Sequence, residues 1–166
     1  MGTVVHAELE RLGSLGRDVP SLVPRPEAWA DSLRRLGLPA TRLPGAVARV
    51  AEAVARVAGS DTAARLLDPA SQEAASEFSL TAWLDGEFVT VKIDRTFVDE
   101  SGVRWIVDWK TGSHEGADVE HFLEQEIGRY AAQLERYSRV MTLYDGRPQA
   151  VGLYFPLLDR WKAWRA

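Results

Sequence analysis

Three strand patterns joined by two turn signals constrain the fold of this chain more than any other feature of its sequence. The segment SEFSLTAWL alternates apolar and polar residues from about Ser76, and Asp85-Gly86 separates it from EFVTVKIDRTFV. Because Asp-Gly is a preferred two-residue turn between strands, these segments predict a β-hairpin. A third apolar segment, VRWIVDWK, follows the turn residues 99–102. The region therefore predicts a meander of three antiparallel strands.

Helical patterns lie on both sides of this meander. Before it, apolar spacing with Pro or Gly stops predicts helices within residues 2–13, 26–38, 43–59 and 60–69. After it, residues 119–144 predict a long helix and QAVGLYFPLL predicts a final strand. The inner positions expected for the long helix are Phe122, Ile127, Tyr130, Ala131, Leu134 and Met141. The order of elements, α-βββ-α-β, indicates an α/β fold.

The composition excludes several kinds of site. The 166 residues are enough for one domain, and the lack of cysteine excludes disulfides, thiolate zinc sites, iron–sulfur clusters and cysteine nucleophiles. Any metal ion must therefore be bound by Asp, Glu, His or backbone carbonyl groups. No apolar run reaches the roughly 20 residues that cross a bilayer, and no leader pattern opens the chain. We expect a cytoplasmic protein with no membrane segment.

Two features bear on nucleic-acid binding. The net charge of −4 argues against a free-standing binder of phosphate backbones. A domain tethered to a larger DNA-binding machine, however, need not supply the affinity itself, and a site that binds metal cations uses several carboxylates to do so. The tryptophans Trp83, Trp105 and Trp109 occupy strand positions, where we expect most to be core or half-buried rather than platforms for stacked bases.

Two aspartates lie where neighbouring predicted strands end. Side chains alternate along a strand, so Lys92 and Asp94 share one face of the middle strand, and Asp108 and Lys110 share one face of the next. Two carboxylates that converge on a small volume repel each other unless a cation lies between them, and Mg²⁺ is the natural candidate. The alternative is that Asp94 pairs with Arg95 or Lys92 and that Asp108 simply ends a strand, where most carboxylates are solvated or ion-paired.

These segments resemble a known family. KIDR and VDWKTG, followed by QLERY on the next helix, look like the PD-(D/E)XK nuclease superfamily. They look most like the RecB/AddA-type nuclease domain found at the C-terminus of UvrD-like helicases, and GTVVHAELERL resembles the N-terminal motif of that family. The resemblance implies a restriction-endonuclease-like core, a mixed sheet flanked by helices. We expect a single domain over residues 1–166, with the first core helix in 1–13, a helical insertion in 14–75 and the βββ-α-β catalytic core in 76–166.

The resemblance also implies roles for individual residues. The metal ligands, for Mg²⁺ or Mn²⁺, would be His6, Asp94, Asp108 and the backbone carbonyl of Trp109. The other residues of the active site would be the catalytic Lys110, the acidic Glu77 near the metal, and the pair Gln133 and Tyr137, which would contact the substrate backbone or support the metal ligands. His6 binds metal only as the neutral imidazole, so we expect binding to weaken as the pH falls.

The function implied is that of a metal-dependent DNA nuclease. The expected substrate is single-stranded DNA, with exonuclease-type action in recombination or repair and with a helicase motor. No GxxxxGK[ST] motif occurs, so such a motor would lie elsewhere in the same or a partner polypeptide. Two alternatives stay open: a catalytically inactive module of the same fold that binds DNA or protein, and a metal-dependent phosphodiesterase that acts on another substrate. The sequence fits both an excised helicase domain and a stand-alone protein.

Overall fold

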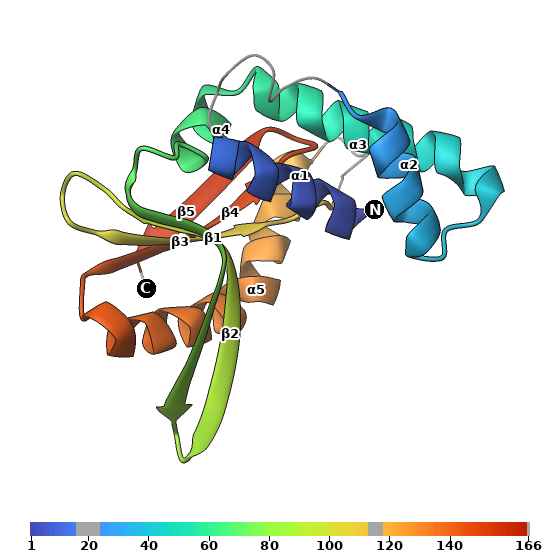
Figure 1. Cartoon of the computed structure of the whole chain (residues 1–166). Helices are drawn as coiled ribbons and strands as arrows, with labels where there is room; N and C mark the ends of the chain where they lie inside the picture. Colours follow the sequence, from blue (N-terminus) through green and yellow to red (C-terminus); the bar gives the residue numbers. More distant parts are fainter. Residues whose placement is uncertain (16–23, 113–117, 166) are drawn as a thin grey trace.

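The computed structural model describes residues 1–15, 24–112 and 118–165, which form helices and one sheet (Figure 1). The helices are α1 (Gly2–Leu15), α2 (Pro26–Arg35), the short 3-10 turn η2 (Ala40–Arg42), α3 (Leu43–Ala58), α4 (Asp61–Leu66) and α5 (Val119–Asp145). The strands are β1 (Gln72–Leu84), β2 (Glu87–Val98), β3 (Arg104–Trp109), β4 (Gln149–Phe155) and β5 (Arg160–Arg165). The expected order of helices and strands is therefore present, with one further strand at the end.

The sheet is mixed, with the strand order β1-β2-β3-β4-β5. Only the β3–β4 pair is parallel, and α5 forms the connection between these two strands. The predicted three-stranded meander is confirmed, because β1, β2 and β3 pair antiparallel in sequence. The strand β5 was not expected. Its sequence RWKAWR is half polar, and it lies at the edge of the sheet beside β4 alone.

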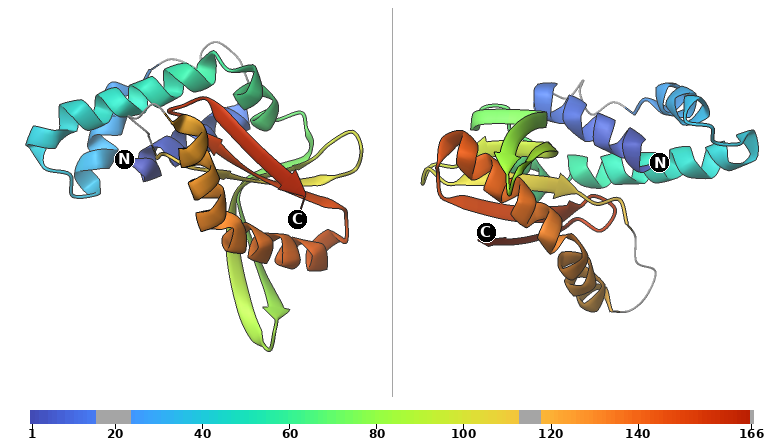
Figure 2. Two further views of the ribbon diagram at one scale, coloured as in Figure 1. Left: turned by 180° about the vertical axis from the view of Figure 1, so that it is seen from behind. Right: turned by 90° about the horizontal axis from the view of Figure 1, so that it is seen from below.

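Helices cover both faces of the sheet, so the α/β fold with flanking helices is confirmed (Figures 1 and 2). On one face, α1 to α4 pack against a core that includes Val107, Trp109 and Tyr154. On the other face, α5 packs against Ile93 and Ile106. Of the inner positions expected for α5, Leu134 and Met141 are fully buried and the other four are half-buried.

The β1–β2 hairpin extends beyond the rest of the sheet (Figure 1). Its turn has positive φ values at Asp85 (53°) and Gly86 (87°), as the predicted Asp-Gly turn requires. The β1–β2 pairing continues to the turn, whereas β2 pairs with β3 only from Arg95 to Val98. The outer part of the hairpin is therefore a two-stranded ribbon. One strand tryptophan departs from expectation, since Trp83 at the end of this ribbon is exposed.

Among residues 1–15, 24–112 and 118–165, no helix combines the length and the apolar character that crossing a bilayer requires.

Candidate active site

The site lies where β2 and β3 separate. Their last backbone pair on this side is Arg95 with Val107. Beyond this pair, the side-chain carboxylate of Asp94 replaces a backbone carbonyl as the hydrogen-bond acceptor from β3. Asp94 Oδ2 accepts the N–H of Trp109 at 2.7 Å. β2 also twists at this point, because Ile93 packs in the core beside α5 while Arg95 donates to the carbonyl of Leu66 on the other side of the sheet. The two strands thus open a gap between α1 and α5.

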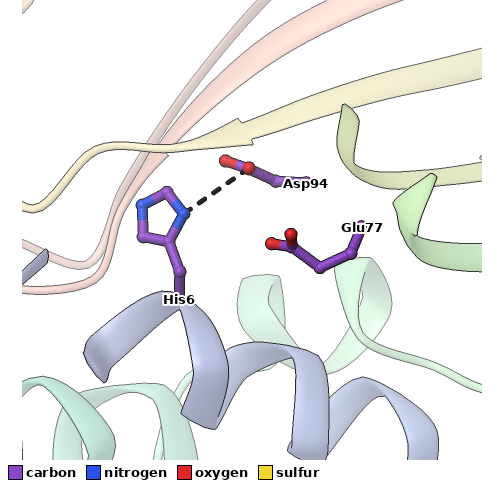
Figure 3. A group of neighbouring side chains, drawn as sticks. All are labelled: His6, Glu77 and Asp94. Atoms are coloured by element: carbon purple, nitrogen blue, oxygen red, sulfur yellow. Dashed lines mark ion pairs between the residues drawn. The ribbon is translucent and has the colours of Figure 1, made fainter. Parts of the chain in front are cut away.

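On the α1 side of this gap, three side chains form a candidate metal-binding group (Figure 3). His6, Glu77 and Asp94 each offer one ligand atom, and these atoms lie within 4.8 Å of one another. Opposite ligands of one Mg²⁺ ion are about 4.2 Å apart, since each lies about 2.1 Å from the metal. The three donors therefore fit a single hard cation after small side-chain movements. His6 Nδ1 already lies 3.5 Å from Asp94 Oδ1.

This group faces an open cleft of about 510 Å³. The cleft is lined by the three candidate ligands together with Gly2, Thr3, Ala7, Glu10 and Lys92. Lys92 forms an ion pair with Glu77 and so partly neutralises the acidic wall of the cleft. The alternative pairing of Asp94 with Arg95 is wrong, because the guanidinium of Arg95 is buried and donates to the carbonyls of Leu66 and Asp68.

On the α5 side of the gap, Asp108 is held by two partners. Its side chain is only 7% exposed, and Lys110 Nζ lies 2.6 Å from its Oδ2. Gln133 donates to its Oδ1 at 3.4 Å and to the hydroxyl of Tyr137 at 2.8 Å. The ammonium of Lys110 also lies 3.5 Å from the ring centroid of Tyr130. Asp108 is therefore not solvated at the end of its strand but buried and ion-paired with Lys110.

The two aspartates are close enough to shift the protonation of the site. Burial first, and then the negative charge of Asp94, raise the pKa of Asp108 to about 6, although Lys110 and His6 act in the other direction. Burial alone would lower the pKa of His6, but its hydrogen bond and charge interaction with Asp94 raise it above the ordinary 6.5. The site holds more negative charge than its own cations neutralise, which is the electrostatic condition that a bound divalent cation relieves.

A glycine brings α1 to this site. A Cβ atom placed on Gly2 would lie 2.9 Å from the side-chain oxygen of Thr111, directly after Lys110. The absence of a side chain at Gly2 therefore lets the start of α1 approach the end of β3 closely. His6 follows Gly2 by one turn of α1, so this close approach positions the imidazole of His6 beside Asp94 on β2.

All eight residues expected at the site gather around the gap between β2 and β3. Three of them, His6, Glu77 and Asp94, already have their possible ligand atoms close enough together to bind one metal ion. Asp108 lies next to this group but is engaged by Lys110 and Gln133, and the backbone of Trp109 contacts both Asp94 and His6. The assignment of individual ligands and catalytic roles stays a prediction.

Tyr130 belongs to the same site, although we expected it only as an inner position of the helix. It lies under the ammonium of Lys110. The signal was present in the sequence, because Tyr130, Gln133 and Tyr137 have the spacing i, i+3 and i+7 of one helical face.

Residues 1–160 match the sequence profile of the PD-(D/E)XK nuclease superfamily, and the chain belongs to this superfamily. The five-stranded mixed sheet with flanking helices agrees with the restriction-endonuclease-like core of the superfamily. A search of curated proteins found no match. The family indicates a phosphodiester hydrolase of the nuclease type, and members typically use a divalent metal ion, for which the His6, Glu77 and Asp94 group is a candidate site.

Proposed function

We propose that this chain is a Mg²⁺- or Mn²⁺-dependent nuclease that hydrolyses phosphodiester bonds of single-stranded DNA. The observation that carries the proposal is the position of the Asp108–Lys110 pair beside the His6, Glu77 and Asp94 group, where β3 ends and β2 continues without it. The membership of a nuclease superfamily supports the same reaction. Imidazole and carboxylate donors suit a hard divalent cation, and a cysteine-free chain offers no softer set.

Four residues would hold the metal ion: His6, Asp94, Asp108 and the Trp109 carbonyl, with Glu77 close by. When bound, such an ion neutralises the scissile phosphate, lowers the pKa of an attacking water and stabilises the leaving oxygen. His6 contributes as a neutral ligand, while Asp94 keeps its position through the N–H of Trp109.

Lys110 would act on the reacting phosphate. Its ammonium lies between the Asp108 carboxylate and the face of Tyr130, so it is held at a fixed point beside the candidate ligands. From there it can orient the attacking water and stabilise the charge that develops on the phosphate oxygens. Gln133 fixes Asp108 and is itself fixed by Tyr137, so these two residues position the acid rather than react.

We further propose exonuclease-type action in the cytoplasm, in DNA recombination or repair, with a helicase motor in the same or a partner polypeptide. The support is the resemblance of the His6, Asp94 and Asp108-Trp109-Lys110 segments to RecB/AddA-type domains. A motor that delivers the strand would also explain a nuclease with a net charge of −4, because local concentration replaces electrostatic attraction.

The proposal is tested with 5′-labelled single-stranded DNA and Mg²⁺ or Mn²⁺, with and without EDTA. We expect products in the presence of metal, none in EDTA and none from the Asp108→Ala variant. Asp31→Asn, an exposed carboxylate paired with Arg34 on α2, is the matched control and keeps full activity. Cleavage that survives both EDTA and Asp108→Ala would sink the mechanism. DNA binding without any cleavage would favour the inactive module, and a circular substrate separates exonuclease from endonuclease action.

A further inference from the structure

One face of the β1–β2 hairpin continues from the candidate metal site to the turn. Because side chains alternate along a strand, Thr90 and Phe88 lie on the same side of β2 as Asp94 and Lys92, which line one cleft. The intervening Val89, Val91 and Ile93 are buried against α5. The partners on β1 that lie opposite these residues are Ser79 for Lys92, Thr81 for Thr90 and Trp83 for Phe88.

The face ends in an exposed aromatic pair. Phe88 is 77% exposed and Trp83 is 60% exposed, and their ring centroids lie 4.8 Å apart in an edge-to-face arrangement. An aromatic pair that stays in water at the end of a projecting ribbon contributes little to the core, so it indicates a binding surface. The strand residues between these rings and the metal site span about 20 Å.

The middle of the face is polar and suits a phosphate backbone. Thr81 Oγ1 and Thr90 Oγ1 share a hydrogen bond of 2.8 Å at the surface, which leaves further donor and acceptor capacity directed to solvent. Lys92 follows, with its ammonium exposed and paired to Glu77 beside the metal site. From the metal site outward, the face therefore presents an ammonium with the Ser79 hydroxyl opposite it, then two threonine hydroxyls and two aromatic rings.

The acidic residues of the turn are neutralised from α5. Arg139 pairs with Asp85 at 2.6 Å, and Arg136 lies 3.7 Å from Glu87. A polyanion that approaches the aromatic pair therefore does not meet unpaired carboxylates at these two positions.

We propose that this face of the hairpin, formed by Ser79, Thr81, Trp83, Phe88, Thr90 and Lys92, is a binding site for single-stranded DNA that leads into the metal site. Bases stack on Trp83 and Phe88, and the phosphates run past the Thr pair and Lys92. Only unpaired bases present their faces for such stacking, so the site selects single strands over duplexes. The proposal deepens the proposed function and rests on it.

Binding is measured by fluorescence anisotropy of 5′-fluorescein-labelled oligo(dT), at low salt and in EDTA, where no cleavage is expected. We expect the Trp83→Ala/Phe88→Ala variant to bind roughly 5- to 30-fold more weakly, as loss of base stacking predicts. Trp83→Leu/Phe88→Leu should be as weak, since leucine is apolar but does not stack. Leu143→Ala removes a side chain that is 60% exposed on α5 and should bind normally. Circular dichroism checks that each variant is folded.

Cleavage assays with two substrates distinguish a defect in this binding site from a defect in the metal centre. In Mn²⁺, the alanine double variant should show a raised KM for long oligonucleotides and unchanged hydrolysis of bis(p-nitrophenyl) phosphate, which is too small to reach the hairpin end. If the wild-type chain hydrolyses neither substrate, the proposed function fails, while the anisotropy result still decides the binding site. Unchanged DNA binding by folded double variants overturns the inference and assigns the aromatic pair to a protein partner. Binding of duplex as tight as that of single strands also overturns it.

Discussion

The carboxylate of Asp94 accepts the backbone N–H of Trp109 at 2.7 Å, at the point where β2 and β3 stop pairing. Its other oxygen lies 3.5 Å from His6 Nδ1. One side chain thus replaces a backbone contact of the sheet and connects α1, the first helix, to β3, which carries Asp108 and ends directly before Lys110. The candidate site is built on an interruption of the sheet, and the helical first half of the chain contributes to it directly.

Asp94→Asn separates the charge of this residue from its structural contact. The amide oxygen still accepts the Trp109 N–H, whereas the negative charge that binds metal is lost. We expect metal-dependent cleavage to fall by at least roughly 100-fold, as for loss of a residue that holds or orients a catalytic metal. Mn²⁺ binding by calorimetry should weaken in parallel. Asp94→Ala should in addition lower the free energy of unfolding by about 1–3 kcal/mol, because it leaves the Trp109 N–H without its acceptor. Equal activity of the Asn variant and the wild type would contradict a ligand role.

Asp108→Asn should stabilise the metal-free protein at neutral pH. The pKa of Asp108 in the folded state, about 6, exceeds the ordinary 3.8, so ionisation of this buried group destabilises the fold. The cost appears as the pH rises above 3.8 and is complete above about 6, where it amounts to about 3 kcal/mol at most. Because Lys110 loses its partner in the variant, we expect a gain of roughly 1–2 kcal/mol at pH 7.5 and none at pH 3.5, measured by urea unfolding in EDTA. A less stable variant at pH 7.5 would contradict this account.

The strand faces of the site could be predicted from sequence because they depend on local periodicity. Alternation placed Lys92 beside Asp94 and Lys110 beside Asp108, and the Asp-Gly turn predicted the hairpin. No local pattern indicates that β2 twists at Asp94 and stops pairing with β3 there, because strand alternation describes each strand by itself and not where two strands part. His6 was accordingly expected at the site only through its resemblance to a family motif.

Two other features were missed for different physical reasons. The half-polar sequence of β5 has a weak strand signal of its own, although it pairs with the preceding strand β4 across the short connection 156–159. Tyr130 has the spacing of a core residue, and only the position of the Lys110 ammonium reveals its contact with that cation. Local patterns thus identified which side chains share a face of one helix or strand, but not which side chains of different elements are in contact.

Tyr130 should support Lys110 through its ring and not through its hydroxyl. The ammonium lies 3.5 Å from the ring centroid, the geometry of a cation–π contact. We expect Tyr130→Phe to cleave DNA at nearly the wild-type rate and Tyr130→Leu to lose about 3- to 30-fold in kcat, as a contact of about 0.5–2 kcal/mol predicts. Steady-state kinetics in Mn²⁺ decide the point. Similar losses in both variants would assign the effect to the hydroxyl instead.

Metal affinity should depend on pH through His6. Asp94 raises the pKa of this imidazole above 6.5, and only the neutral ring binds a cation, so protonation competes with the metal as the pH falls through that raised value. Titrations with Mn²⁺ between pH 8 and pH 6 should therefore show weaker binding at lower pH, and His6→Ala should bind more weakly throughout with a flatter profile. His121→Ala is the control, because His121 is exposed at the start of α5. A wild-type profile in the His6 variant would remove His6 from the ligands.

Substitution of two glycines by alanine should change the free energy of unfolding in opposite directions. A Cβ atom on Gly152 in β4 would lie 2.1 Å from the ring of Trp161 in β5, which itself packs on Trp105. We expect Gly152→Ala to displace that ring and to lower the free energy of unfolding by about 1–3 kcal/mol. Gly128, exposed in the middle of α5, has open space where its Cβ would lie, so Gly128→Ala should raise the free energy of unfolding by about 0.5–1 kcal/mol through helix propensity. Thermal and urea unfolding measure both. A neutral Gly152→Ala would mean that β5 does not hold Trp161 over β4 in solution.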